Sequence, residues 1–515
     1  MDLNKIEELR NKAALQMNEG NFLEAHATAK EILSLGSDSI ISFLVSGIYI
    51  DVGSATNNED TVLEGLKILE ADFKNIKKMN AAAAFYNRGN GYYSLFKIKR
   101  DDAPLFHLFK NTELDNAIKY YRMALTINIE NKELLAQILI NLGNCYDSCG
   151  RVIEALECYE EAISICPNHG MALGNKGIAL SFFAEIMAEH EITFLVEAYN
   201  LILNAIKLGV HHESESAFIK KIEDIRRKIP DTAILEKPLK LPGYKINVEN
   251  KVEKFLMKFC LKNRLYLNIC NYCQKCDACI GDSVLIKNMI IPIEEDISNN
   301  AFLRLSSYLN QIKQDYISAR FLLILSLYEK INYTFVDKYV RMIDTFEGNL
   351  YNINIQLLKF SFKSLYDILD KIANFLNDYL SLGVPERRVY FHRIWYSERD
   401  KLRNKIKTSK NPTLNALYKI HKDFDNEEYN KLKKIRNALT HRFVKIKNIQ
   451  MKENAEEMTV KTLIDHTIKL AKIVRTVIIY VVYYVDIEER MKYDNTKTVS
   501  LTAKEIDDKD KYFRI

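Results

Sequence analysis

The stretch that decides the fold is "LINLGNCYDSCGRVIEALECYEEAISICP", residues 139–167. Small and large apolar residues alternate here at offsets that suit two antiparallel helices. Gly143 and Ala155 let the two backbones approach closely, and Tyr159 fills the groove between them. Pro167 ends the second helix because it cannot continue the backbone hydrogen bonding. The stretch therefore predicts a tightly packed helical hairpin.

The same spacing resembles the tetratricopeptide repeat (TPR), a helix–turn–helix unit of 34 residues. The match covers every diagnostic position of the repeat: Leu142, Gly143, Tyr146, Gly150, Ala155, Tyr159, Ala162 and Pro167.

Weaker copies flank this repeat. They lie at residues 11–33, 38–77, 89–124 (with an insertion around 97–113) and 177–205. We therefore predict four or five TPR-like hairpins over residues 1–228. Such a solenoid presents a concave surface that holds a peptide, a partner protein or another copy of the chain, and it performs no chemistry by itself.

Composition agrees with a helical protein of two to four domains. The 515 residues include only 8 Pro and 17 Gly, are 48% hydrophobic and 27% charged, and carry a net charge of +5. The most apolar run, residues 477–484, is far shorter than the about 18 residues a spanning helix needs, so no membrane segment is expected. Nine cysteines without a secretion signal indicate a reducing cytoplasm and free thiols.

Residues 229–299 are expected to be a linker and connecting segment that is rich in cysteine. Within it, "LNICNYCQKCDACIGD" (267–282) spaces four cysteines three residues apart: Cys270, Cys273, Cys276 and Cys279. Zinc ribbons place about 12–20 residues between their two cysteine pairs, and only two residues separate the pairs here. Reduced thiols are the favoured interpretation, and metal binding stays open as the alternative.

Residues 300–490 predict a four- or five-helix bundle, and residues 491–515 a polar tail. Long helices are expected over 301–331 and 459–490, with another over 425–443. Between them, residues 357–379 carry one continuous apolar stripe at spacings of four and three. The predicted fold is therefore all-α, with a helical solenoid followed by a helical bundle.

One helix of this bundle contains "KKIRNALTHRF", residues 433–443. Arg436, Asn437 and His441 are its candidate catalytic residues, and Lys433, Lys434 and Arg442 are candidate RNA-binding residues. The surroundings are basic, since residues 396–450 hold 15 Lys and Arg against 6 Asp and Glu. Spacing alone is not specific, because Arg387 and His392 repeat the same Arg-x4-His pattern nearby.

The segment "LKKIRNALTHRFVKI" resembles the R-x4–6-H motif of HEPN (higher eukaryotes and prokaryotes nucleotide-binding) domains. Upstream, "SLYDILDKIANFLNDYLSLG", "RVYFHRIWY" and "NPTLNALYKIHKDF" resemble a HEPN branch that follows TPR-type repeats in bacteria. The resemblance covers about residues 250–450. It departs from related sequences at Thr440, where an acidic residue is often found.

The resemblance implies a metal-independent endoribonuclease without cofactors that acts as a homodimer in toxin, abortive-infection or anti-phage systems. A histidine can accept the 2′-OH proton and a guanidinium can stabilise the phosphate, and a two-fold dimer would supply a second acid–base group. The products would carry a 2′,3′-cyclic phosphate, and DNA would not be cut. Two other hypotheses remain: a non-catalytic TPR scaffold whose bundle dimerises or binds RNA, and the HEPN half of a pair with a nucleotidyltransferase.

Overall fold

The structure is a computed structural model of the chain. It describes residues 3–36, 38–100, 109–186, 190–210, 212–236, 248–269, 277–292, 301–329, 333–344, 346–398, 401–425, 427–448, 454–492 and 498–502, together with residues 504, 506 and 511. The chain divides into two compact units, residues 1–239 and 240–515. The boundary falls inside the segment that the sequence predicts to be a linker.

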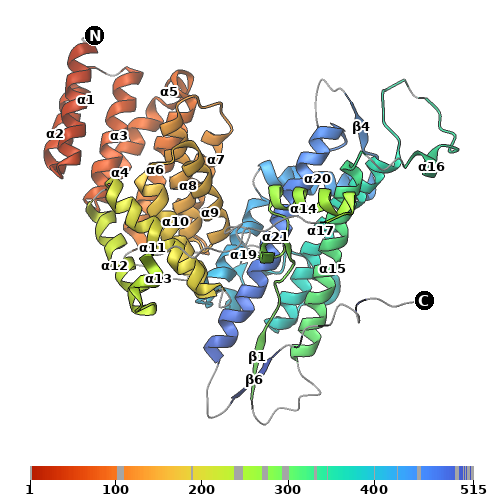
Figure 1. The fold of residues 1–515 in the computed structure, drawn as a ribbon. Helices are drawn as coiled ribbons and strands as arrows, with labels where there is room; N and C mark the ends of the chain where they lie inside the picture. The colour runs from red at the N-terminus through yellow and green to blue at the C-terminus, as the bar shows by residue number, and fades with distance from the viewer. Residues whose placement is uncertain are drawn as a thin grey trace. The chain divides into compact units, whose positions relative to one another are not determined.

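The first unit is a stack of helical hairpins, drawn from red to yellow in Figure 1. The hairpins pair successive helices: α1 (Leu3–Asn18) with α2 (Phe22–Ser34), α3 (Ser39–Ala55) with α4 (Glu59–Ala71), α6 (Ala81–Arg100) with α7 (Thr112–Leu125), α8 (Lys132–Ser148) with α9 (Val152–Ile165), and α10 (Gly170–Ile186) with α11 (Glu191–Leu208). The short helix α5 (Phe73–Met79) precedes α6, and α12 (His212–Lys228) and α13 (Thr232–Glu236) close the unit. The insertion expected around 97–113 lies partly outside the described residues.

Close approach at glycines explains the tight helical hairpin of residues 139–167. A Cβ at Gly143 would come within 2.5 Å of the Tyr159 ring. The hairpin α6–α7 repeats the arrangement, because a Cβ at Gly89 would lie 2.6 Å from Tyr121. Both tyrosines are buried, so each glycine of the pair is a packing requirement of its hairpin.

The second unit is a helical bundle, drawn from green to blue in Figure 1. Its long helices are α15 (Ala301–Leu327), α17 (Ile353–Tyr379), α19 (Pro412–Asp423), α20 (Glu427–His441) and α21 (Val460–Lys492). Helix α17 packs on α15, α20 and α21, and α19 packs on α21. Shorter helices are α14 (Lys251–Asn263), α16 (Thr334–Asp337) and α18 (Asn404–Lys407).

Three two-stranded ladders accompany the helices in the described part of the chain. Strand β1 (Asn288–Pro292) pairs antiparallel with β6 (Thr498–Thr502), β2 (Tyr396–Glu398) pairs antiparallel with β3 (Lys401–Leu402), and β4 (Lys445–Lys447) pairs parallel with β5 (Glu457–Thr459). The chain is thus dominated by helices, and the all-α prediction is confirmed. The predicted linker contains α13, α14 and β1, and part of the predicted polar tail forms β6.

Buried arginines attach the region around the cysteine cluster to the bundle. Arg475 of α21 donates hydrogen bonds to the carbonyl oxygens of Tyr266 and Asn268, both at 2.7 Å. Arg320 of α15 forms a buried ion pair with Asp282 at 2.7 Å. Because buried charges are costly unless paired and hydrogen-bonded, these contacts fix residues 265–269 and 277–284 against the bundle.

Candidate active site

Helix α20 carries five of the six residues that the sequence selects as catalytic or RNA-binding, and the sixth, Arg442, directly follows its last residue. Leu432, Ile435 and Ala438 are buried, and their spacing of three places them on one face of the helix. That face packs toward α17. The polar residues of the motif occupy the rest of the helix circumference, where Asn437 and His441 are exposed and Arg436 is half-buried.

Arg436 lies against α17. Its Nη2 is 3.4 Å from Asp367 Oδ1, and its guanidinium lies over the Tyr366 ring with 5.5 Å to the ring centre. Nη1 donates a long hydrogen bond of 3.4 Å to Asn437 Oδ1. Burial raises the pKa of Tyr366, so the ring beneath the guanidinium is an uncharged phenol at neutral pH. Arg436 is thus held by an acidic and an aromatic neighbour that the sequence analysis did not identify.

His441 is the last residue of α20 and lies exposed at the other flank of the helix. It lines a cavity of about 970 Å³ together with Asn437, Lys434, Arg442 and, from α21, His466. Arg442 forms an ion pair with Glu456, which lines the same cavity. Four of the six predicted residues are therefore brought together.

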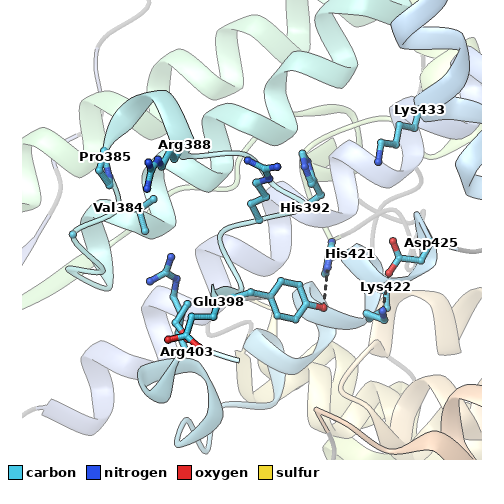
Figure 2. A pocket seen from close by; sticks show the side chains of 14 residues that line it. Val384, Pro385, Arg388, His392, Glu398, Arg403, His421, Lys422, Asp425 and Lys433 are labelled. Carbon is cyan, nitrogen blue, oxygen red and sulfur yellow. Dashed lines mark hydrogen bonds and ion pairs between the residues drawn. The ribbon is translucent and has the colours of Figure 1, made fainter. Parts of the chain in front are cut away.

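Arg436 and Lys433 are not among the described residues that line this cavity. Five residues along an α-helix correspond to a rotation of about 140°, which separates the Arg436 side chain from that of His441. Lys433 lines a different cavity, together with Arg388 and His392 (Figure 2). The motif is thus divided between two sides of one helix.

His466 is the residue that sequence reasoning missed. It falls within the long helix expected over residues 459–490, and no functional role was predicted for it. The structure instead puts it, half-buried, in the wall that also holds His441. The sequence signal that could have identified His466 is its position at the edge of the apolar stripe of α21. It lies three residues after the buried Leu463 and one before the buried Thr467.

The second Arg-x4-His pair lies in an irregular segment. Glu386–Arg388 forms a single 3-10 turn, and residues 391–395 form turns. His392 lines the same cavity as Lys433, whereas Arg387 is exposed and does not line it. The two copies of the pattern therefore belong to different surroundings.

Of the cysteine cluster, Cys270, Cys273 and Cys276 lie outside the described residues. Cys279 is fully buried, and its carbonyl oxygen accepts a hydrogen bond of 3.0 Å from Asn268 Nδ2. Within the described ranges there is no group of three or more side chains arranged to hold a metal ion. The same ranges contain no helix long and apolar enough to cross a bilayer.

Family models match a segment in each of the two units. Residues 298–488 match the model of the LA2681-like HEPN family, and residues 136–169 match the tetratricopeptide repeat. The chain is therefore a TPR-repeat protein with a C-terminal HEPN domain, and the predicted solenoid and HEPN-like bundle are confirmed. A HEPN domain behind TPR repeats suggests a nuclease-like or RNA-binding role together with protein–protein interaction.

Two solved structures resemble parts of the chain at low identity. The crystal structure of MamA protein is 20% identical and covers 45% of this chain and 97% of its own, with a TM-score of 0.23. A structure from the functional characterization of Pseudomonas aeruginosa pilF is 13% identical and covers 45% of this chain and 95% of its own, with a TM-score of 0.27. A search of curated proteins gave no match.

Proposed function

We propose that this protein is a metal-independent endoribonuclease of the HEPN type, acting as a toxin or anti-phage effector whose TPR array binds a protein or peptide regulator. One observation carries the proposal. The helix of the HEPN domain that holds the motif places His441 and Asn437 in one cavity with the cations Lys434 and Arg442 and a second imidazole, His466.

The residue types suit RNA cleavage without metal. The imidazole of His441 can accept the 2′-OH proton, and a second group can act as the acid that protonates the leaving 5′-oxygen. Lys434 and Arg442 provide positive charge for the phosphate, and Asn437 offers an amide that can donate to a phosphate oxygen. His466 supplies a candidate for the second acid–base group within the same chain.

The position of Arg436 supports a dimeric site. A guanidinium binds phosphate through two parallel hydrogen bonds, but Arg436 points away from the cavity that holds His441. A two-fold dimer that packs α20 against its copy would bring Arg436 of one chain to the His441 cavity of the other. We therefore propose that the functional site is shared between two chains.

The TPR array contributes a ladder of asparagines suited to peptide recognition. Asn141 Nδ2 donates to Asn90 Oδ1 at 3.1 Å, and Asn175 Nδ2 donates to Asn144 Oδ1 at 2.8 Å. These residues lie on α6, α8 and α10, the first helices of three successive hairpins, and all are half-buried. Side-chain amides are both donors and acceptors, which matches the backbone of a bound peptide.

The test is cleavage of RNA by the full-length protein in the presence of EDTA, followed by analysis of the product ends. We expect 2′,3′-cyclic phosphate and 5′-OH ends, no cleavage of DNA, and a loss of at least about 100-fold with His441→Ala, in keeping with the usual contribution of acid–base catalysis. His392→Ala is the matched control because it removes an imidazole from the second Arg-x4-His pair, and it should retain cleavage.

Growth on induction provides the parallel measurement in cells. Growth inhibition by the wild-type and His392→Ala proteins, but not by His441→Ala, supports the nuclease. Equal growth with all three proteins, or RNA binding without cleavage, would instead support the non-catalytic scaffold.

A further inference from the structure

Between α15 and α17 the chain forms a projecting lobe, residues 334–344 and 346–350. The lobe begins with α16, and in Figure 1 this short helix lies on a loop that extends away from the packed helices of the bundle unit. Seven large apolar side chains of the lobe are exposed: Phe335, Val336, Tyr339, Val340, Met342, Ile343 and Phe346. Single exposed apolar residues are ordinary, but a group of this size within one short segment marks an interaction site.

Three of these side chains are almost completely exposed. Tyr339 is 83% exposed, Ile343 is 87% exposed and Phe346 is 92% exposed. None of the seven side chains lines the cavity of His441 or that of Lys433. The apolar groups of the lobe therefore project into solvent and do not form the walls of either recess.

Hydrogen bonds hold the lobe at both of its ends. Near its start, Asp337 Oδ2 accepts a hydrogen bond of 2.8 Å from the backbone N–H of Ile353, the first residue of α17. At its end, the backbone N–H of Leu350 donates a hydrogen bond of 2.8 Å to the carbonyl oxygen of Ile446 in β4. The exposed apolar side chains are therefore presented from an anchored segment of the fold.

Phe346 has an unusual backbone conformation. Its φ is +57°, in the left-handed region that bulky side chains rarely adopt. Its backbone N–H donates a hydrogen bond of 2.8 Å to Asp344 Oδ1. Because the ring is exposed, its contacts within the chain do little to offset the strain. A strained residue of this kind is typical of a position with a function.

The two cations of the lobe, Lys338 and Arg341, are exposed, and no carboxylate of the described residues forms an ion pair with either of them. Lys338 Nζ lies 4.7 Å from the centre of the Tyr339 ring. The three carboxylates of the lobe are held by other groups, two by the backbone N–H groups of Ile353 and Phe346 and that of Glu347 by Lys445. The outward charge beside the apolar side chains is therefore available to an anionic partner.

We propose that the lobe attaches this protein to the surface of a bilayer that contains anionic phospholipid. The apolar side chains enter the boundary between head groups and acyl chains, and Lys338 and Arg341 bind lipid phosphates. Long cationic side chains suit this layer because their stems lie along apolar surface while the charge stays in the polar layer. A tyrosine ring suits it for the same reason, with its hydroxyl as the polar end.

The observations favour a bilayer over a protein partner. A stable protein interface takes about 20–30 residues from each partner and packs them as closely as a protein interior. The lobe offers seven apolar side chains, and the most exposed of them project singly into solvent. A bilayer accepts such side chains without a complementary shape. The proposal does not depend on ribonuclease activity, because no residue of the lobe lines the cavity of His441.

The experiment is co-sedimentation of the full-length protein with vesicles of phosphatidylcholine, and with vesicles of phosphatidylcholine and phosphatidylglycerol in equal amounts. We expect binding to the anionic vesicles and much weaker binding to phosphatidylcholine alone. The double variant Ile343→Ser/Phe346→Asn should weaken binding at least about 10-fold, because two large apolar side chains no longer leave water. The double variant Lys338→Gln/Arg341→Gln should weaken binding to the anionic vesicles at least about threefold.

The double variant Leu23→Ser/Leu303→Ser is the matched control, because it removes two exposed apolar side chains outside the lobe. It should bind the anionic vesicles as the wild type does. Asparagine tolerates the left-handed conformation at position 346, so the lobe variant is expected to fold, and circular dichroism checks this. The exposed Lys338→Gln/Arg341→Gln variant provides the test if the apolar variant does not fold.

Three results would overturn the proposal. The first is the absence of sedimentation with the anionic vesicles. The second is an equal loss of binding in the lobe variants and in the control. The third is a dimer in light scattering that becomes a monomer in Ile343→Ser/Phe346→Asn, without vesicle binding by the wild type, which would make the lobe an interface between two copies of the chain.

Discussion

Arg436 and His441 lie on the same helix, but their side chains meet different neighbours. Arg436 Nη2 is 3.4 Å from Asp367 of α17, whereas His441 lines a cavity with Asn437 and with His466 of α21. A rotation of about 140° separates the two positions around the helix axis. Within one chain, the cation and the imidazole of the motif therefore do not face one phosphate group.

If two chains share the site, two inactive variants should complement each other. Arg436→Ala and His441→Ala should each be inactive alone. When the two chains are expressed together, half of the dimers are mixed and each mixed dimer holds one intact site, so about a quarter of wild-type cleavage should return. The rate of RNA cleavage by the co-purified chains is the measurement. Failure of the mixture to recover activity, when both chains are present in the dimers, would show that each chain uses its own Arg436 and His441.

Asp367 should restrain Arg436 in the free protein. Asp367→Asn removes the negative charge but keeps a side chain of the same size, so the guanidinium becomes free to bind phosphate. Exposed ion pairs are worth about 0–1 kcal/mol, which corresponds to at most about a fivefold fall in KM for RNA. Asp378→Asn on the same helix is the control, because that carboxylate pairs with Arg304 instead. A rise in KM specific to Asp367→Asn would mean that Asp367 positions Arg436 for catalysis.

His421 should make the protein less stable in mild acid. Burial lowers its pKa to about 3, with Lys422, His392 and Lys433 acting in the same direction and Asp425 opposing them. The unfolded chain takes up the proton below about pH 6.5 and the native state does not, so the free energy of unfolding falls as the pH decreases from 6.5 toward 3. At pH 5 the loss is about 2 kcal/mol at most, from 1.4 kcal/mol per pH unit.

Urea unfolding of wild type and His421→Gln at pH 7.5 and pH 5 measures this effect. The two proteins must be compared because other groups also change the stability in mild acid. Burial raises the pKa of Asp51 and of Asp147 to about 6, so protonation of these carboxyl groups favours the native state and opposes the effect of His421. We expect His421→Gln to lose less stability on acidification than wild type. His441→Gln, which removes an exposed imidazole, is the control. The prediction is contradicted if the free energy of unfolding changes equally with pH in the wild type and in His421→Gln.

Gly143→Ala should destabilise the TPR array by about 1–3 kcal/mol, because the added methyl group would overlap the buried ring of Tyr159. Gly47→Ala is the matched control. Gly47 is also helical, but its nearest neighbour is the flexible amide of Asn87 at 3.3 Å, which can move. Thermal unfolding followed by circular dichroism should show a lower melting temperature for Gly143→Ala than for Gly47→Ala. Equal melting temperatures would show that the hairpin relaxes around the extra carbon.

Local patterns in the sequence account for most of the fold. The glycine and tyrosine positions of residues 139–167 require a close helical hairpin, and the stripe over residues 357–379 requires a long amphipathic helix, observed as α17 (Ile353–Tyr379). The stripe repeats within one helix and the hairpin joins two successive helices, so local spacing is enough to predict both. The ladder between β1 and β6 was not predicted, because its strands are about 200 residues apart in the chain and each is only five residues long.

The sequence by itself determined the helical repeat, the HEPN-like bundle and the helix that carries Arg436, Asn437 and His441, because these follow from side-chain spacing along one element. Only the tertiary structure decided which residues meet. In the folded chain Arg436 contacts Asp367, and His466 lines the same cavity as His441. The adjacent residues Lys433 and Lys434 line two different cavities. The physical reason is that neighbours on a helix point about 100° apart, so packing against α17 and α21, and not sequence proximity, selects their surroundings.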